Sequence, residues 1–202
     1  MKLKSLVLAL LIFSTGSAHA LSFGVLAGYR SDTPIFISGN PLVTNFSGSV
    51  PSSYQAGAFV GHTLIGPIEL TLGMLYKART TSMTATVMAV SSGLTLKDTL
   101  FDFPLRLNLS LPAGLYLTTG ATYSSVQTSS CSGAFGNMPC PVGTFRDVDD
   151  VAALIGAGFK FVKFAGFSLA VEGVYDYGLR DQSGVSGVSG WARGIEANVV
   201  AK

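Results

Sequence analysis

The sequence predicts an all-β fold, an eight-stranded antiparallel up-and-down transmembrane β-barrel. Three observations predict it. Apolar and polar residues alternate along segments that recur through the chain, the connections between these segments are long and short in turn, and only 12% of the residues are charged. Charged residues make up about 25% of a typical soluble domain. Half that share leaves too few charges to cover a water-exposed surface.

The first 20 residues, MKLKSLVLALLIFSTGSAHA, have the order of a secretory signal peptide. Lys2 and Lys4 precede a short apolar core, and Ala18 and Ala20 supply the small residues of a cleavage site before Leu21. The apolar run is too short to span a bilayer as a helix, and a buried N-terminal helix would not require this order of features. We therefore expect residues 1–20 to be removed and residues 21–202 to form one outer-membrane barrel domain.

The composition of the remaining chain narrows its class. Without Lys2 and Lys4 the 13 Lys and Arg fall to 11, which equals the 11 Asp and Glu, and this balance predicts no nucleic-acid partner. Mean hydropathy is +0.48, yet no later segment has about 18 uninterrupted apolar residues, so no transmembrane helix is expected. An exported chain that is apolar without long apolar runs is typical of a membrane β-barrel.

Eight segments carry the alternation, and each is near the length of about 9–11 residues that crosses a bilayer as a tilted strand. They are residues 21–30, 54–65, 68–79, 96–111, 115–124, 150–161, 167–178 and 191–201. In FDFPLRLNLSL (101–111), the Phe and Leu side chains alternate with Asp102, Pro104, Arg106, Asn108 and Ser110. We expect lipid on the Phe/Leu face and the barrel interior on the other. Proline has no N–H for the ladder, so a bulge or irregularity is expected at Pro104. The alternation in 54–65 does not assign its faces.

The connections between these segments alternate in length. Long connections span 31–53, 80–95, 125–149 and 179–190, whereas short ones span 66–67, 112–114 and 162–166. Outer-membrane barrels have short periplasmic turns and longer outer loops, so both chain ends are predicted to lie on the periplasmic side. A soluble lipocalin-like barrel would instead bury its large residues and expose Lys and Glu, but the second face here is mostly Gly, Ala, Ser and Thr.

Aromatic residues gather toward the predicted strand ends, as in the two girdles of membrane barrels. The outer group is Tyr29, Tyr76, Phe101, Phe103, Tyr123, Tyr175, Tyr177 and Trp191, and the periplasmic group is Phe23, Phe159, Phe161 and Phe167. The core of a soluble domain would not require rings to cluster at strand ends.

Two hairpins carry a family resemblance. FDFPLRLNLSLPAGLYLTTGATYS (101–124) has an aromatic-x-x-Pro-Leu strand, a short turn and an aliphatic/Gly strand. VAALIGAGFKFVKFAGFSLAVEGVYDYGLRD (151–181) has a Gly-x-Gly strand, a turn and Glu-x-x-Tyr-x-Tyr-Gly-Leu. Both resemble the eight-stranded outer-membrane β-barrel domain family, the PorT-like and OmpX-like group. The resemblance implies the barrel fold and a place in the outer membrane. The family includes secretion accessories, adhesion-type proteins and members of no known role.

The chain departs from many outer-membrane barrels at its C-terminus. Such barrels resemble one another in ending on an aromatic residue used for assembly, whereas this chain ends Val200-Ala201-Lys202. Either the assembly signal is atypical or the aromatic requirement is relaxed.

Strand parity points a balanced set of charges into the barrel. The set is Arg30, Glu69, Lys77, Asp102, Arg106, Lys160, Glu172, Asp176 and Glu196. An ion or substrate path would use such charges, but the interior of an eight-stranded barrel is just filled by side chains. A paired polar core is therefore the favoured interpretation, in which Arg106 pairs across the lumen with Glu172 or Glu196.

The remaining reactive residues are few. Cys131 and Cys140, the only cysteines, lie in one predicted outer loop and predict a disulfide in an exported protein. No further Cys or His accompanies them, so no metal site or other cofactor is expected. The acids of 146–150 could bind Ca²⁺ loosely, but no EF-type loop surrounds them. His62 has no recognisable nucleophile by spacing, and the chain is predicted not to be an enzyme.

These features predict an integral outer-membrane β-barrel whose partners are the lipid bilayer and a protein or surface ligand at its outer loops. Its role would be structural or one of surface interaction. Three alternatives stay open: an accessory of a secretion or transport machinery, a narrow pore, and a membrane-embedded hydrolase.

Overall fold

The structure, a computed structural model, describes residues 21–38, 43–87, 90–133, 136–139, 149–164, 166–179 and 188–202. The predicted signal peptide lies outside these residues. The strands are β1 (Leu21–Ser38), β2 (Val43–Ile65), β3 (Ile68–Val87), β4 (Val90–Ser110), β5 (Leu115–Gly133), β6 (Gly136–Pro139), β7 (Asp149–Phe164), β8 (Phe167–Gly178) and β9 (Val188–Ala201). One 3₁₀ turn, η1 (Pro112–Gly114), joins β4 to β5. Within the described ranges, no helix has the length and apolar character needed to cross a membrane.

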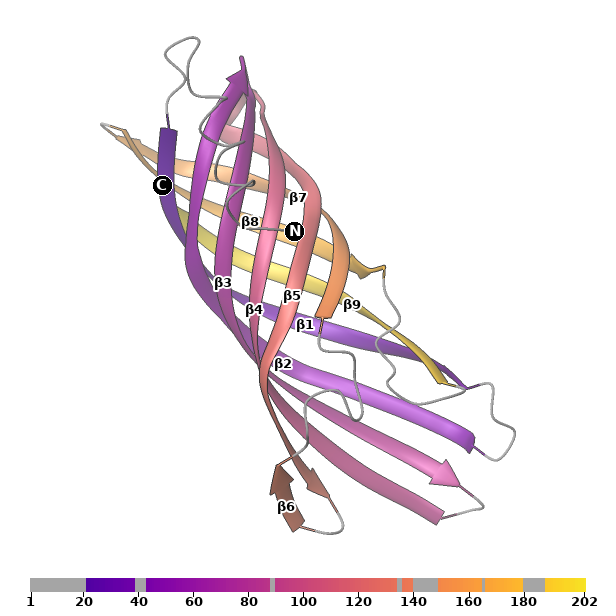
Figure 1. Ribbon diagram of the computed structural model, residues 1–202. Helices are drawn as coiled ribbons and strands as arrows, with labels where there is room; N and C mark the ends of the chain where they lie inside the picture. Colours follow the sequence, from indigo (N-terminus) through magenta and orange to yellow (C-terminus); the bar gives the residue numbers. More distant parts are fainter. Residues whose placement is uncertain are drawn as a thin grey trace, which may run out of the picture.

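Eight of the strands close into a ring, as Figure 1 shows. Each pairs antiparallel with its neighbours in chain order, β9 pairs back onto β1, and β4 pairs with β5. The short strand β6 lies outside the ring and pairs only with β5 among the described strands. The eight-stranded antiparallel up-and-down barrel predicted from the sequence is therefore confirmed.

The strands are longer than predicted, and two of the four long connections are largely strand. β1 and β2 run on to Ser38 and back from Val43, and β3 pairs with β4 as far as Val87↔Val90. The prediction of loops at 31–53 and 80–95 was wrong. These segments are rich in Ser, Thr and Val, and β-branched residues favour a paired strand whether lipid or water surrounds it. β5 likewise continues to Gly133, within the segment predicted as the third loop.

The short connections lie together at one end of the barrel, which we call the turn end. Gly66-Pro67 joins β2 to β3 and η1 joins β4 to β5, as predicted, while β7 continues to Phe164 and leaves a tighter turn before β8. Gly66 has φ 55° and Gly114 has φ 81°, a left-handed backbone that glycine adopts without strain. The opposite end, where β1 to β5 extend beyond the ring, is called the extended end.

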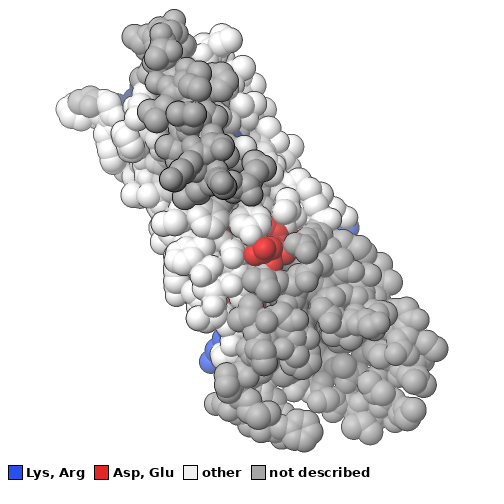
Figure 2. Space-filling view, in the orientation of Figure 1, with Lys and Arg blue, Asp and Glu red and all other residues white. Residues whose placement is uncertain are grey.

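The two faces of the sheet have opposite polarity. Large apolar side chains point outward and stay exposed, among them Phe23 at 68% and Ile155 at 63%. Most of the charged side chains that point inward are buried, with Asp102 only 1% and Asp176 only 2% exposed. Figure 2 shows one side of the molecule, on which little of the described surface is charged. This matches the predicted facing of the alternating residues.

The faces of 54–65 could not be assigned from the sequence because small residues point outward there and a large one points inward. Ala56 and Ala58 are small but point outward and are exposed, whereas Phe59 is large and lines the interior. The same ambiguity hid Tyr54, which is exposed on the outer face beside Tyr29, their ring centroids 5.7 Å apart.

Other predicted girdle residues also lie outside. Rings of neighbouring strands meet there, Tyr76 with Phe101 at 6.0 Å between centroids and Phe103 with Tyr123 at 6.3 Å. The exposed aromatic residues further include Tyr175, Tyr177, Phe159, Phe161 and Phe167. Trp191 lies in β9 opposite Ile35 of β1, but its side chain is outside the described part.

Pro104 interrupts one ladder without a bulge. Its β5 partner is Thr122. Toward β3, pairing stops at Leu72↔Leu105 and resumes at Leu75↔Asp102 in the same register. The strand ladder is therefore interrupted beside this proline, which has no N–H to donate, and an irregularity there was predicted. The register shift of β4 lies elsewhere, at Thr99/Leu100 in its pairing with β5.

Glycines on the inner face make room for large side chains of the next strand. A Cβ at Gly158 would collide with the Tyr116 ring, one at Gly28 with the Asn198 side chain, and one at Gly24 with the Phe59 ring. This pairing of a small and a large residue lets a narrow tube hold bulky polar groups.

We expect Gly158→Val to displace Tyr116 and lower the free energy of unfolding by about 1–3 kcal/mol, the usual cost of overpacking a filled interior. Urea titration of the protein folded in detergent measures it. The control is Gly173→Val, because the nearest atom to a Cβ at Gly173, the Glu196 carbonyl oxygen, is 4.0 Å away. A Gly158 variant as stable as the Gly173 variant would contradict this account.

Candidate functional site

The centre of the barrel interior holds an ion-paired cluster built on Glu172 of β8. Arg106 Nη1 of β4 donates to Glu172 Oε1 at 2.6 Å, and the Tyr116 hydroxyl donates to Glu172 Oε2 at 2.9 Å. Asn198 Nδ2 donates to Glu172 Oε1 at 3.0 Å and to Glu196 Oε2 at 3.3 Å. Both oxygens of Glu172 are thus hydrogen-bonded, which a buried carboxylate requires.

A second cluster surrounds Arg30 of β1, one step nearer the extended end. Arg30 donates to Asp32, to Asp176 Oδ2 at 2.6 Å and to Glu196 Oε1 at 2.9 Å. The other oxygen of Glu196, Oε2, lies 3.7 Å from Arg106 Nη2. Glu196 therefore joins the two clusters, with one carboxylate oxygen toward each arginine.

Two more pairs cross between β3 and β4. Lys77 pairs with Asp102, and Arg79 Nη2 lies 3.2 Å from Asp98 Oδ2. The Ser129 hydroxyl of β5 donates to Asp98 Oδ1 at 2.7 Å. All four charged side chains are buried, so each cation is neutralised by a neighbour rather than by water.

A separate polar group closes the turn end. Glu69 of β3 accepts a hydrogen bond from Ser22 Oγ of β1 at 2.7 Å and pairs with the Lys202 ammonium after β9. Lys202 also exchanges backbone hydrogen bonds with Ser168 of β8. Lys160 donates to Ser110 Oγ at 3.2 Å and lies over the Tyr116 ring, 5.4 Å from its centroid.

The structure brings together the charges that parity pointed inward. Arg106 lies against both of its candidate partners, and Arg30, Asp176 and Glu196 form one group. Sequence reasoning missed Asp32, Arg79, Asp98, Asn198, Tyr116 and Lys202. The first three lie on the same parity as Arg30, Lys77 and Asp102. Asp32 falls beyond the predicted end of its strand, whereas Arg79 and Asp98 lie inside the predicted segments 68–79 and 96–111. Extending the alternation of 21–30 by one pair of residues would have found Asp32, and following the inward parity to the ends of 68–79 and 96–111 would have found Arg79 and Asp98.

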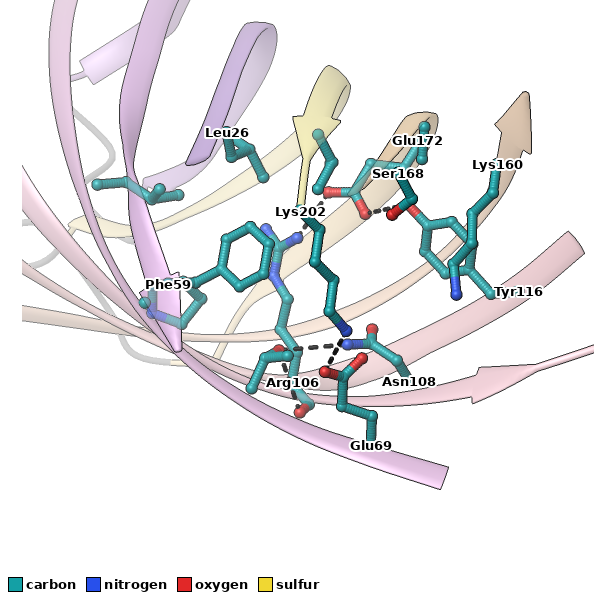
Figure 3. Close-up of a pocket in the computed structure, with 16 residues that line it drawn as sticks. Leu26, Phe59, Glu69, Arg106, Asn108, Tyr116, Lys160, Ser168, Glu172 and Lys202 are labelled. Atoms are coloured by element: carbon teal, nitrogen blue, oxygen red, sulfur yellow. Dashed lines mark hydrogen bonds and ion pairs between the residues drawn. The ribbon is translucent and has the colours of Figure 1, made fainter. Parts of the chain in front are cut away.

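Apolar side chains complete the filling of the tube. Leu75, Leu100, Leu154 and Val174 point inward and are buried. A cavity of about 60 Å³ lies toward the turn end, where Figure 3 shows the side chains of Arg106, Glu69 and Lys202 converging on it. A volume of this size holds a few water molecules.

The predicted disulfide and the acidic loop segment lie largely outside the described residues, whereas His62 lies within them. Cys140 and the side chain of Cys131 lie outside the described residues, and so do residues 146–148 of the acidic loop segment. His62 has the outward parity of Ala58 and Val60, close to the turn end of β2. In the described ranges, His, Cys, Asp and Glu form no group of three or more placed to hold a metal ion.

No protein-family model matches the chain, and no curated protein matches its sequence. The PorT-like and OmpX-like resemblance therefore stays a prediction. Among solved structures, Neisserial surface protein A is similar at 14% identity, over 91% of this chain and 99% of that one, with a TM-score of 0.47. The outer membrane protein OprG from Pseudomonas aeruginosa is similar at 11% identity, over 88% and 94%, with a TM-score of 0.45. The translocator domain of the autotransporter NalP from Neisseria meningitidis is similar at 10% identity, over 98% and 94%, with a TM-score of 0.41.

We expect Arg106→Leu to lower the free energy of unfolding by about 3–5 kcal/mol, because it leaves Glu172 buried without its cation. Replacing both Arg106 and Glu172 by Leu removes the charges together and should cost less than the two single changes summed. Urea midpoints in detergent measure all three. Arg193→Leu is the control, since Arg193 is exposed. An unchanged midpoint for Arg106→Leu would exclude a stabilising pair.

Proposed function

We propose that this protein is an integral outer-membrane β-barrel, exported by a cleaved signal peptide, with its turn end in the periplasm and an interior closed to ions. Its role is structural or one of surface interaction, carried by the strands that extend beyond the membrane. One observation carries the proposal: the outer face of the closed sheet is apolar while its inner face holds paired charges.

Membrane insertion is supported by the apolar outer surface, which would be unusual for a protein dissolved in water. Soluble monomers expose scattered apolar residues but seldom a patch of more than a few hundred Å². Here exposed Leu, Ile, Val and Phe side chains follow one another around the ring, on β1, β4, β5, β7, β8 and β9. In lipid this surface needs no cover, and ring closure leaves no strand edge without partners in the hydrocarbon.

A closed interior is supported by the ion pairs at successive depths. The Arg30, Arg106 and Lys77 pairs lie inside the same tube, with Leu75, Leu100 and Val174 packed among them. An ion crossing this interior would have to displace charges that already neutralise one another. This favours a structural interior over the narrow pore that the sequence left open.

A role outside the membrane is supported by the uneven lengths of the strands. Beyond Asp32↔Val50, β1 leaves β2 and continues with β9 to Ser38↔Val188, while β2 continues with β3 to Val43↔Val87. Figure 1 shows these two parts projecting from the barrel at the extended end. Paired strands hold their shape outside the bilayer better than loops, which suits contact with a protein or another surface ligand.

Membrane insertion predicts a depth-dependent penalty for charge on the outer face. Leu105 is exposed between aliphatic neighbours, Leu72 of β3 and Ala121 of β5. Leu105→Arg should cost about 2–4 kcal/mol, whereas Phe164→Arg at the end of β7 should cost about 0–1 kcal/mol. Folding into lipid vesicles, titrated with urea and followed by heat-modifiable mobility on a gel, measures both. Equal costs, or a wild-type protein that stays monodisperse without detergent, would reject the membrane barrel.

A closed interior predicts no steady single-channel conductance of the wild-type protein in planar bilayers. Arg30→Ala should open a cation-selective current, because it leaves Asp32, Asp176 and Glu196 unneutralised and frees space for water. Arg193→Ala, on the outer face, should stay silent, and heat-modifiable mobility verifies that both variants fold. Steady conductance of the wild-type protein would favour the pore instead.

A further inference from the structure

The cavity at the turn end has spare hydrogen-bond donors, and both of its carboxylates are already paired with a cation. Glu172 accepts hydrogen bonds on both oxygens, and Glu69 already accepts from Ser22 and pairs with Lys202. By contrast, the Lys160 ammonium contacts two uncharged groups in the described part of the chain, the Ser110 hydroxyl and the Tyr116 ring. An ammonium has three donors, so Lys160 can still donate to an incoming acceptor.

A second donor on the cavity wall is unpartnered. Arg106 is more than nine-tenths buried, and among the described residues its Nε has no hydrogen-bond partner. A buried donor without an acceptor costs free energy. Of the charged residues that line the cavity, three are cations, Arg106, Lys160 and Lys202, and two are carboxylates, Glu69 and Glu172. Glu172 pairs with Arg106 and Glu69 with Lys202, so among the described residues of the wall Lys160 is the cation without a carboxylate partner.

Apolar side chains line one part of the wall. Leu26, Phe59 and Leu75 lie on β1, β2 and β3, and Figure 3 shows Leu26 and Phe59 on the side of the cavity away from Lys160. A cavity with cations on one side and hydrocarbon on the other suits a small ligand with one anionic and one apolar end.

We propose that this cavity binds a small organic acid, its carboxylate accepting hydrogen bonds from Lys160 and its short hydrocarbon part lying against Leu26 and Phe59. The acid enters at the turn end, where the side chain of Lys202 is 25% exposed and that of Glu69 is 13% exposed. A lipid headgroup does not fit, because every wall residue is on the inner face of a closed ring. Binding in detergent does not depend on which side of a membrane the turn end faces, so it can be tested apart from the proposed function.

The test uses the full barrel in a zwitterionic detergent with sodium propionate as the probe, its binding followed by saturation-transfer NMR. Propionate should bind to the wild-type barrel. Lys160→Met should weaken propionate binding at least about tenfold, the factor expected from losing a hydrogen bond to a charged group. The matched control is Lys163→Met on the same strand, because Lys163 is exposed, and it should bind like the wild type.

A second variant tests the charge balance in the opposite direction. Glu69→Gln removes a carboxylate from the wall and frees Lys202, so propionate should bind more tightly. Retained heat-modifiable mobility shows that each variant is folded. Wild-type affinity in Lys160→Met, equal losses in Lys160→Met and Lys163→Met, or weaker binding in Glu69→Gln would overturn the site. Inorganic phosphate binding as tightly as propionate would overturn the organic-acid class.

Discussion

The closure of the hydrogen-bond ladder is the constraint on which the rest of the structure depends. A bilayer core offers no water to backbone N–H and C=O groups, so each strand needs a partner on both sides. The pairing of β9 with β1, and of β4 with β5, removes the last free edges within the ring. Once the ring is closed, every residue faces either outward or inward, and the alternating sequence is divided between two environments.

Closure with eight strands also fixes how much the tube can hold. An interior of this size is just filled by side chains, so bulky polar groups fit only where a neighbour is small. Tyr116 over Gly158 and Asn198 over Gly28 are examples. Glycines on the inner face thus leave the space that the bulky polar groups of the ion-pair network occupy. The residue types of the inner face therefore follow from the number of strands.

What the sequence could predict follows from the same division. A period of two residues identifies the faces wherever large and small residues respect it, and so Arg106, Glu172 and Glu196 could be placed together in advance. It failed at Phe59, because the interior accepts a large ring where Gly24 leaves room. It also failed at strand ends, since the ladder continues beyond the length of strand that is needed to cross the bilayer. Asp32 was missed for that reason.

The inward charges also specify the register of the strands. A slip by one residue would turn every side chain of a strand to the other face, which would place Arg106 against acyl chains and Leu105 in the polar interior. A charge in the hydrocarbon is costly, whereas in the observed register Arg106 reaches Glu172 of β8 and Glu196 of β9. Because Glu196 also bonds Arg30 of β1, the partners of one strand constrain those of three others. The network therefore excludes alternative pairings around the ring, a role that an apolar filling of equal volume would not perform.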